Sequence, residues 1–366
     1  MSRTESKISQ FQLFFIILQT QIGIEIITLP YEVFKISNVD AWISVLLIGL
    51  FVQINIVLIW LLYRRFPSLT IFEMMSEIVG RHLAFFLKIA YIVYFFSIAT
   101  LVILLFGRMV NIWILPRTPI WILVLIMIVV CVLCAKENLR VMARFYVVVS
   151  ALLIVFIVLL TSLVKNADYL HILPVGQYGL PVILKSATQA IMAFLGYELL
   201  LVVLPYSLGN NAGKLKVALI ANGIVTILYL FLTIFSIAFF GPSVMKFIPE
   251  PILYIMKYSS FQIIERTDLL FLSIWVVTVG TTFMMYLYLT SNGLANMFTK
   301  INRSTFVYCI ASLIFILSFF IPTTDKVISS ISKYVTFACY FFIFVLPCIL
   351  LIVSILRGKK EEPGAV

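Results

Sequence analysis

The sequence predicts an all-α polytopic membrane protein with ten transmembrane helices, and two observations carry this prediction. Hydrophobic residues make up 63% of the 366 residues and charged residues only 11%, whereas about 25% charged residues is usual in a soluble domain. Apolar runs of about 20 residues, long enough to cross a hydrocarbon core of about 30 Å, recur along the whole chain. The runs are continuous rather than alternating, which favours helices over a transmembrane β-barrel.

The apolar runs define ten expected spans within a single transmembrane domain, residues 1–366. Their approximate ranges are 11–35, 41–63, 83–107, 119–135, 142–164, 184–207, 215–240, 267–296, 304–321 and 334–356. More lysines and arginines fall on the side of the two termini than on the other side. The positive-inside rule therefore predicts that both termini are cytoplasmic. The same clustering in short loops next to a lipid bilayer accounts for the net charge of +11 without a nucleic-acid partner.

Three connections between the spans are longer than simple turns. The stretch FPSLTIFEMMSEIVGRH (66–82) contains a capping box from Thr70 to Glu73 and predicts a short amphipathic helix on the cytoplasmic face. Proline and glycine punctuate the expected outer loop at 164–183. For the outer loop at 241–266 we expect a short interfacial helix.

The chain contains no arrangement typical of an enzyme or a metal site. His82 and His171 are the only histidines, and nothing gives them metal-site spacing. Cys131 and Cys134 form a C-x-x-C inside an apolar run, so we interpret them as buried small residues rather than a redox pair. Because no nucleophile motif or soluble domain accompanies them, the sequence predicts no enzyme activity, no cofactor and no bound metal.

A short motif occurs twice, as IGIEIITLPY (22–31) in the first span and as LGYELLLVVLPY (195–206) in the sixth. Both copies run from a glycine through a glutamate to Leu-Pro-Tyr, with two additional residues before the second proline. The shared residues are Gly23, Glu25 and Pro30 in the first copy and Gly196, Glu198 and Pro205 in the second. The ten spans thus divide into two sets of five that begin in the same way.

This division predicts an inverted repeat, with repeat one at about 11–164 and repeat two at about 184–356. Five is odd, so the second set enters the membrane in the opposite orientation, and matching interrupted helices point to the binding site. Glycine and proline loosen the helical ladder and free backbone groups near the midplane, where they can hold a polar solute. The alternative is that these residues only allow close packing or a kink.

The two glutamates are the least expected residues in the motif. Placing an acidic residue at the centre of a membrane helix costs about 2.5–3.5 kcal/mol on insertion scales. Glu25 and Glu198 therefore face protein or water rather than lipid. Three roles stay open for each: a protonated acid, a partner for a cation, or a cap for free backbone N–H groups.

The eighth span adds hydroxyl groups, with Thr278, Thr281 and Thr282 around Gly280. Thr278 and Thr282 are four residues apart and so share one helical face. Their hydroxyls could contact a ligand or a cation, or could bond to the backbone of their own helix. In the third span Tyr94 belongs to a polar-edged stripe that either packs between helices or walls the solute pocket.

These residues together suggest a family. The chain resembles the B subunits of spore nutrient-germinant receptors, the GerAB/GerKB-type spore-germination permeases of the amino acid–polyamine–organocation transporter superfamily. The resemblance covers nearly the whole length. It rests on the glycine-containing first span that ends in LPY, on FPSLTIFEMMSEIVGRH, on GYELLLVVLPY and on IIERTDLLFLSIWVV (263–277).

The resemblance implies a leucine-transporter-like fold and a subunit that binds a small nutrient, most often an amino acid. It also implies assembly with an A-type membrane subunit and a C-type lipoprotein in the spore inner membrane. The implied binding residues are Ile22, Gly23, Ile24, Glu25, Tyr94, Phe194, Gly196, Tyr197, Glu198, Thr278, Gly280 and Thr281. The family pattern has small residues where Glu25 stands, and this departure favours an amine or a protonated-acid contact over carboxylate binding by bare N–H groups.

Two functional hypotheses follow. In the first, a nutrient binds at the midplane between broken helices 1 and 6 and shifts conformational populations that partner subunits read. In the second, the chain is a proton- or cation-coupled amino acid transporter in which Glu25 or Glu198 changes protonation state. Accumulation of labelled nutrient by the reconstituted protein would separate the two.

Overall fold

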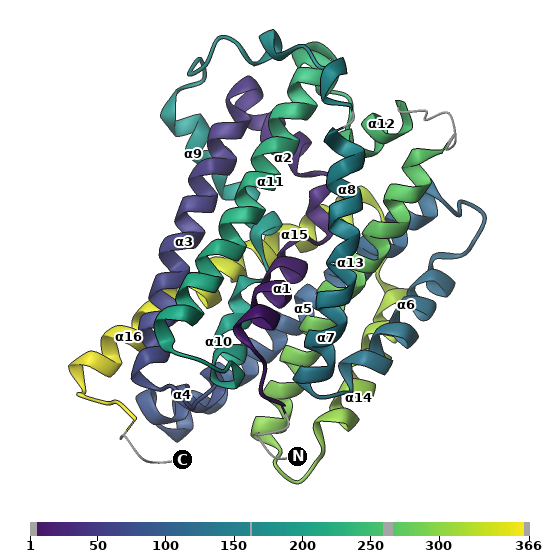
Figure 1. Ribbon diagram of the computed structural model, residues 1–366. Coiled ribbons are helices and arrows are strands. Elements are labelled where there is room, and N and C mark those ends of the chain that lie inside the picture. Colours follow the sequence, from purple (N-terminus) through teal and green to yellow (C-terminus); the bar gives the residue numbers. More distant parts are fainter. Residues whose placement is uncertain (1–5, 162, 259–265, 362–366) are drawn as a thin grey trace.

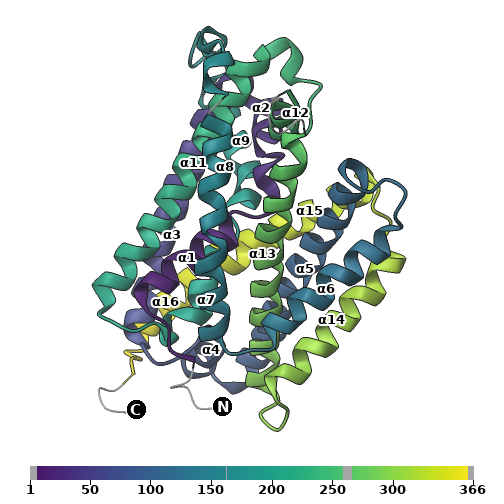
Figure 2. The ribbon, with the colours of Figure 1, turned by 45° about the vertical axis from the view of Figure 1, so that its right-hand side comes forward.

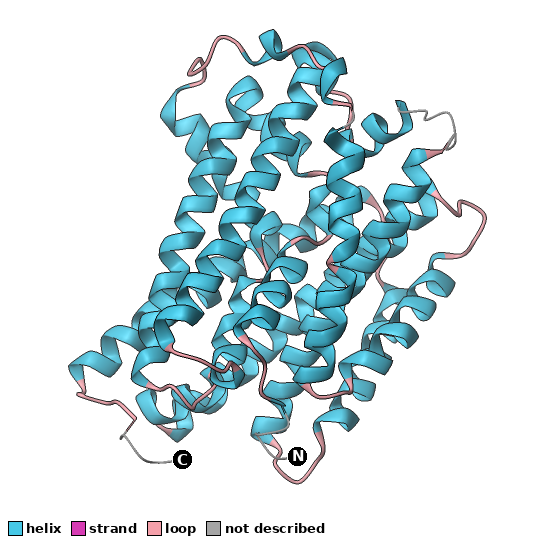
Figure 3. Cartoon of the chain, viewed as in Figure 1, coloured by secondary structure: helices cyan, strands magenta, loops and turns pink. Residues whose placement is uncertain are grey.

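The computed structural model describes residues 6–161, 163–258 and 266–361. These residues form helices joined by turns, and no strand occurs among them (Figure 3). Seven of the described helices are long and apolar enough to cross a membrane, or up to eight if one bent pair is a single span. Every one of the ten expected ranges coincides with helical segments, while the count of ten crossings stays a prediction.

The helices of the first half come in the order of the expected spans. They are α1 (Gln10–Gln21), α2 (Leu29–Ser37), α3 (Ala41–Arg65), α4 (Ile71–Val79), α5 (Arg81–Trp113), α6 (Ile120–Ala135), α7 (Leu139–Val149) and α8 (Ala151–Thr161). The first expected span thus consists of α1 and α2, separated by the short 3₁₀ turn η2 (Ile24–Ile26).

The second half is interrupted in a similar way. Its helices are α9 (Gly179–Ala190), α10 (Leu200–Val203), α11 (Asn211–Met245), α12 (Pro251–Tyr258), α13 (Thr267–Met297), α14 (Arg303–Phe320), α15 (Asp325–Cys339) and α16 (Leu346–Leu356). Three 3₁₀ turns flank α10: η6 (Ile191–Phe194), η7 (Tyr197–Leu199) and η8 (Leu204–Tyr206). The segments 179–194 and 197–206 bend by 57° relative to each other.

The two interrupted segments lie side by side and run in opposite directions. At one end, the N–H of Ile8 donates to the carbonyl of Tyr206 over 2.9 Å. At the other end, the hydroxyl of Ser37 donates to that of Ser186 over 2.9 Å. Between these contacts, the interruption that follows α1 packs against the one around Gly196. An inverted repeat requires this antiparallel arrangement of its two leading helices.

The other helices enclose this central pair. Helix α11 packs against α1, α2 and α3 on one side, while α13 packs against α1, α5 and α6 on the other (Figures 1 and 2). The start of α1 and the end of α16 lie at the same end of the molecule. The interruptions are therefore surrounded by protein, where free backbone polar groups can find partners.

Both short helices expected in the connections are present. Helix α4 begins after Thr70, and the N–H of Thr70 donates to Oε2 of Glu73 over 2.8 Å, so the predicted capping box is confirmed. The chain near its C-terminus contacts the same connection, because the guanidinium of Arg357 donates to the carbonyl of Ile78 on α4 over 3.0 Å. Helix α12 is the short helix expected in the loop at 241–266. Residues 259–265 of this loop lie outside the described residues.

Candidate functional site

The first interruption begins where α1 ends at Gln21. The N–H of Ile22 still donates to the carbonyl of Leu18 over 3.0 Å, but the N–H of Gly23 turns back to the carbonyl of Gln21 over 2.9 Å. Regular helix resumes only at Leu29, with Pro30 in its first turn, a position where proline's missing N–H does no harm. The glycine and the proline thus mark the two ends of the non-helical segment.

Gly196 makes the closest contact between the two interruptions. Its φ of +120° lies in the region that favours glycine. A Cβ at this position would lie 2.7 Å from the carbonyl carbon of Thr20 and 2.9 Å from the backbone nitrogen of Gln21. Backbone cannot move aside as a flexible side chain can, so only glycine fits where the two segments meet.

Glu198 is buried and held by the protein itself. The N–H of Gly196 donates to its Oε2 over 2.7 Å, and the hydroxyl of Tyr286 on α13 donates to its Oε1. The side chain is fully buried. Of the three roles left open by the sequence, this geometry corresponds to a cap for a free backbone N–H.

A second polar network connects both interruptions to α11. The Nε2 of Gln21 donates to the carbonyl of Phe194 and to Oδ1 of Asn222, each over 3.1 Å. The hydroxyl of Tyr229 lies 2.8 Å from the carbonyl of Gln21 and 3.0 Å from that of Ala193. The Phe194 carbonyl therefore finds its donor on Gln21, and the single Tyr229 hydrogen of α11 serves one of the two carbonyls beside it, as burial away from water requires.

On the α13 side, Thr282 bonds to the end of α1, whereas Thr281 and Thr278 bond within their own helix. The hydroxyl of Thr282 donates towards the carbonyl of Thr20 over 3.2 Å, and Thr281 donates to the carbonyl of Thr278 over 2.6 Å. Thr278 itself donates to the carbonyl of Trp275 over 2.8 Å. Bonding within the helix, one of the two interpretations drawn from the sequence, accounts for Thr278.

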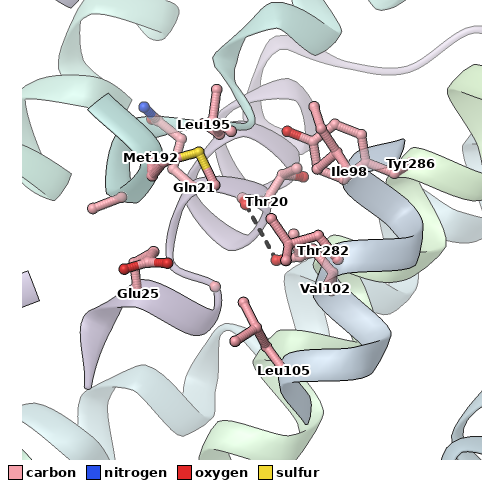
Figure 4. Close-up of a pocket in the computed structure, with 13 residues that line it drawn as sticks. Thr20, Gln21, Glu25, Ile98, Val102, Leu105, Met192, Leu195, Thr282 and Tyr286 are labelled. Carbon is pink, nitrogen blue, oxygen red and sulfur yellow. Dashed lines mark hydrogen bonds between the residues drawn. The ribbon is translucent and has the colours of Figure 1, made fainter. Parts of the chain in front are cut away.

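A cavity of about 40 Å³ lies between the two interruptions, α5 and α13 (Figure 4). Its lining is Thr20, Gln21, Gly23, Glu25, Ile98, Leu101, Val102, Leu105, Met192, Ala193, Leu195, Thr282 and Tyr286. Glu25 is the one charged residue among them, and Figure 4 shows it on the side opposite Tyr286. The Thr28 hydroxyl donates to Oε2 of Glu25 over 3.0 Å. The site therefore combines one carboxylate with a mainly apolar wall.

The implied binding residues divide into those at this cavity and those away from it. Gly23 and Glu25 line it. Ile22 lines a different cavity of about 320 Å³, an apolar one between α1, α7, α8 and α11. The backbone of Ile24 forms part of η2, and its side chain lies outside the described residues.

Other implied residues pack around the cavity without lining it. The ring of Tyr94 stacks on that of Phe342 at 5.0 Å, and Tyr197 is buried beside Glu198. The hydroxyl of Tyr197 finds no hydrogen-bond partner among the described residues, and that of Tyr94 meets the thiol of Cys339. Gly280 faces α6, with Met127 Sδ 3.5 Å from the place a Cβ would take. A role in ligand binding for these residues stays a prediction.

The sequence analysis did not identify Thr20, Gln21 and Tyr286 as lining residues. Together with Gln19, Thr20 and Gln21 form three consecutive polar residues in an apolar run just before Gly23, a signal that could have identified them. Tyr286 carried no such signal, because its neighbours in the sequence are apolar or aromatic. Its role depends on the position of α13 beside Glu198, which only the fold reveals.

Comparison with known proteins identifies the family. The family model described as spore germination protein, the spore permeases, matches residues 7–328. The chain belongs to the spore germination protein family. It is 25% identical over 327 residues to spore germination protein GerQB of Bacillus cereus, covering 88% of this chain and 89% of that protein. It is 26% identical to spore germination protein A2 of Bacillus subtilis, covering 98% of each chain.

A solved structure shares the fold. The crystal structure of MhsT in complex with L-phenylalanine superposes with a TM-score of 0.68, covering 95% of this chain and 89% of that one, at 14% identity. This likeness confirms the leucine-transporter-like fold, and at this identity it carries the fold alone. The family match and the long apolar helices together show that the chain is a multi-pass membrane protein of the spore germination family.

Proposed function

We propose that this chain is the nutrient-binding B-type membrane subunit of a spore germination receptor. The observation that carries the proposal is the cavity between the two interruptions, with Glu25 as its charged residue, in a member of the spore germination family. A small nutrient, most often an amino acid, binds there near the membrane midplane. Spore germination proteins are not an enzyme class, and no catalytic role is proposed.

Binding would act through a change of conformational populations. A ligand shifts an equilibrium only as far as its affinities for the two states differ. The cavity lies where four separate elements meet: the first interruption, the second interruption, α5 and α13. A nutrient bound there favours one relative position of these elements, and that position is passed on to an A-type membrane subunit and a C-type lipoprotein in the spore inner membrane, with both termini cytoplasmic.

The alternative is a proton- or cation-coupled amino acid transporter. The fold shared with MhsT, a protein solved with L-phenylalanine bound, supports an amino acid as ligand under either function. The two functions differ in what happens after binding. A receptor subunit holds the nutrient without accumulating it, whereas a transporter accumulates it against a gradient.

The test uses the purified protein, both in detergent and in sealed liposomes. A thermal-shift screen of amino acids, sugars and nucleosides identifies the nutrient, because a ligand of the folded state raises stability by RT ln(1 + [L]/Kd). Labelled nutrient is then offered to the liposomes with and without a pH or sodium gradient. Binding without accumulation supports the receptor, and gradient-driven accumulation supports the transporter instead.

The location of the site is tested by filling the cavity. Ile98 lines it from α5 and makes no polar contact in the described structure, so Ile98→Trp occupies the space of the ligand. Val102→Trp, one turn further along α5, repeats the test should the first variant fold poorly. Loss of the nutrient-induced thermal shift in a folded variant is the expected result. If the nutrient-induced thermal shift were unchanged in both variants, the nutrient would bind outside this cavity.

A further inference from the structure

The polar groups that line the cavity differ in whether they are still available to a ligand. Each side-chain donor there already donates within the protein. Thr20 donates to the carbonyl of Ile16 over 2.7 Å, and Thr282 to that of Thr20 over 3.2 Å. Both hydrogens of the Gln21 amide and the hydroxyl of Tyr286 are likewise used. A ligand therefore meets no uncommitted side-chain donor at this wall.

Two backbone N–H groups that a broken helix could present are committed as well. The N–H of Gly23 donates to the carbonyl of Gln21 over 2.9 Å, and that of Gly196 donates to Glu198 over 2.7 Å. In a site built for a carboxylate, such groups would point at the ligand. Here the second of them serves the protein's own carboxylate, Glu198.

Acceptors, in contrast, remain available. Oε1 of Gln21 is buried and has no hydrogen-bond partner among the described residues. Glu25 receives one bond, from Thr28 to Oε2, which leaves Oε1 of its carboxylate open. An ionised carboxylate offers about four lone-pair sites and can only accept. The rest of the lining is apolar: Ile98, Leu101, Val102, Leu105, Met192 and Leu195.

From this imbalance we infer that the cavity recognises its ligand through a primary ammonium group carried on an apolar body, with Glu25 and Gln21 as acceptors. The inference rests on the proposed function and names the chemistry of its ligand. An ammonium brings three donors and no acceptor, which complements this wall. It also balances the charge of the part-buried Glu25 carboxylate, and an unpaired charge becomes more costly as its burial increases. A ligand carboxylate at the same place would meet Glu25 as a like charge.

The size of the cavity agrees with a head group. A water needs about 10–15 Å³ by a comparable measure, so about 40 Å³ holds a group of a few heavy atoms. A larger apolar body requires neighbouring side chains to move. Met192 is suited to this, because methionine is unbranched and adapts its shape to what it contacts.

The experiment compares matched trios of probes on the purified protein by calorimetry and thermal shift. One trio is L-leucine, isoamylamine and 4-methylpentanoate, in which the same branched body carries both charged groups, only the amine or only the carboxylate. Ethylamine, L-alanine and propanoate form a smaller trio; phenethylamine, L-phenylalanine and 3-phenylpropanoate form a larger one. We expect the amine of the best-fitting trio to bind at least as tightly as its amino acid, and the acid to bind at least tenfold more weakly.

Variants separate the head-group contact from the site as a whole. Glu25→Gln should weaken binding of the amine at least tenfold and remove the preference for amine over acid. The matched control is Glu77→Gln, because Glu77 is exposed on α4, a helix that contributes no residue to the cavity lining. It should bind the amine as the unaltered protein does.

The failures of the two proposals differ. If the acids bind as tightly as the amines, or Glu25→Gln binds amines normally, while Ile98→Trp abolishes binding, the site stands and the ammonium inference is overturned. If no trio binds to the unaltered protein while a sugar or nucleoside of the thermal-shift screen does, the site stands and the ammonium inference is overturned. If no compound of either set binds, or binding survives both Ile98→Trp and Val102→Trp, the proposed nutrient site fails and the inference fails with it.

Discussion

Glu25 and Glu198 occupy matching positions in the two copies of one motif, and the fold gives them opposite surroundings. Glu198 is fully buried and accepts bonds from the Gly196 N–H and the Tyr286 hydroxyl. Glu25 is half-buried, lines the cavity and accepts one bond from Thr28, three residues along the chain. The Glu198 carboxylate holds two segments of the protein together, and the Glu25 carboxylate faces the space where a ligand fits.

The difference arises from what lies opposite each interruption. Helix α13 brings Tyr286 to Glu198, and the left-handed turn at Gly196 points its own N–H at the same carboxylate. Nothing comparable reaches Oε1 of Glu25 in the described part of the chain. Repeated sequence can therefore supply one structural and one functional copy of the same residue, because each copy meets a different neighbour in the assembled bundle.

The largest effect on stability is expected at Gly196, which positions Glu198. Gly196→Ala places a methyl group within 3 Å of the backbone of Thr20 and Gln21 and forces a residue with a side chain to adopt a φ of +120°. Strain of about 1–3 kcal/mol adds to overpacking of about 1–3 kcal/mol. We expect a loss of about 2–6 kcal/mol, measured by the thermal midpoint of the purified protein.

Gly223→Ala is the matched control for this substitution. Gly223 lies inside α11, and its nearest neighbour to a new Cβ is the amide nitrogen of Gln53 at 3.5 Å, an ordinary contact. Alanine is favoured over glycine inside a helix by about 1 kcal/mol, so this variant should be as stable as the unaltered protein or more so. Equal midpoints for the two variants would contradict the close packing of the interruptions.

The sequence predicts those parts of the site that leave a pattern along the chain, and it does not predict those that depend on contacts between distant segments. Gly23, Glu25 and Gly196 could be identified because their repetition is visible along the chain, and the short helix at 71–79 because its capping box is local. The lining residues on α5 could not, since Ile98 and Val102 look like any other apolar residue of a span. Which side chains face a cavity depends on how each helix rotates in the bundle.

The same reasoning explains what the sequence left open about the glutamates. Composition and hydropathy established that both avoid lipid, but the choice between a structural cap and a ligand contact depends on Tyr286, 88 residues beyond Glu198. A contact between residues so far apart in the sequence leaves no periodic pattern from which it could be predicted. The bundle resolves it for Glu198 through two hydrogen bonds, while the role of Glu25 rests on the proposed function.

A paired substitution tests the contrast between the two glutamates directly. Glu198→Ala leaves a buried N–H and a buried hydroxyl without their acceptor, at about 1–3 kcal/mol each. Removal of the buried carboxylate offsets part of this cost, so we expect a loss of about 2–4 kcal/mol. Glu25→Ala removes one half-exposed bond to Thr28 and should cost less than about 1 kcal/mol. Urea or thermal unfolding of the two purified variants measures both values. Similar losses of unfolding free energy in both variants would show that the two carboxylates contribute equally to stability, which would contradict the contrast between them.

The smallest effect sharpens the comparison at the level of a single hydroxyl. Tyr286→Phe removes one of the two donors to Glu198 while keeping the ring, and loss of a hydrogen bond to a charged group is worth about 1.5–3 kcal/mol. Because the Gly196 N–H still holds the carboxylate, we expect a loss near the lower end, about 1.5–2 kcal/mol. Tyr197→Phe provides the control, since the Tyr197 hydroxyl is buried without a partner among the described residues. Removing a buried hydroxyl that makes no bond should leave the thermal midpoint unchanged or raise it. A lower midpoint for Tyr197→Phe than for Tyr286→Phe would contradict the role of Tyr286 and would indicate that Tyr197, not α13, holds Glu198 in place.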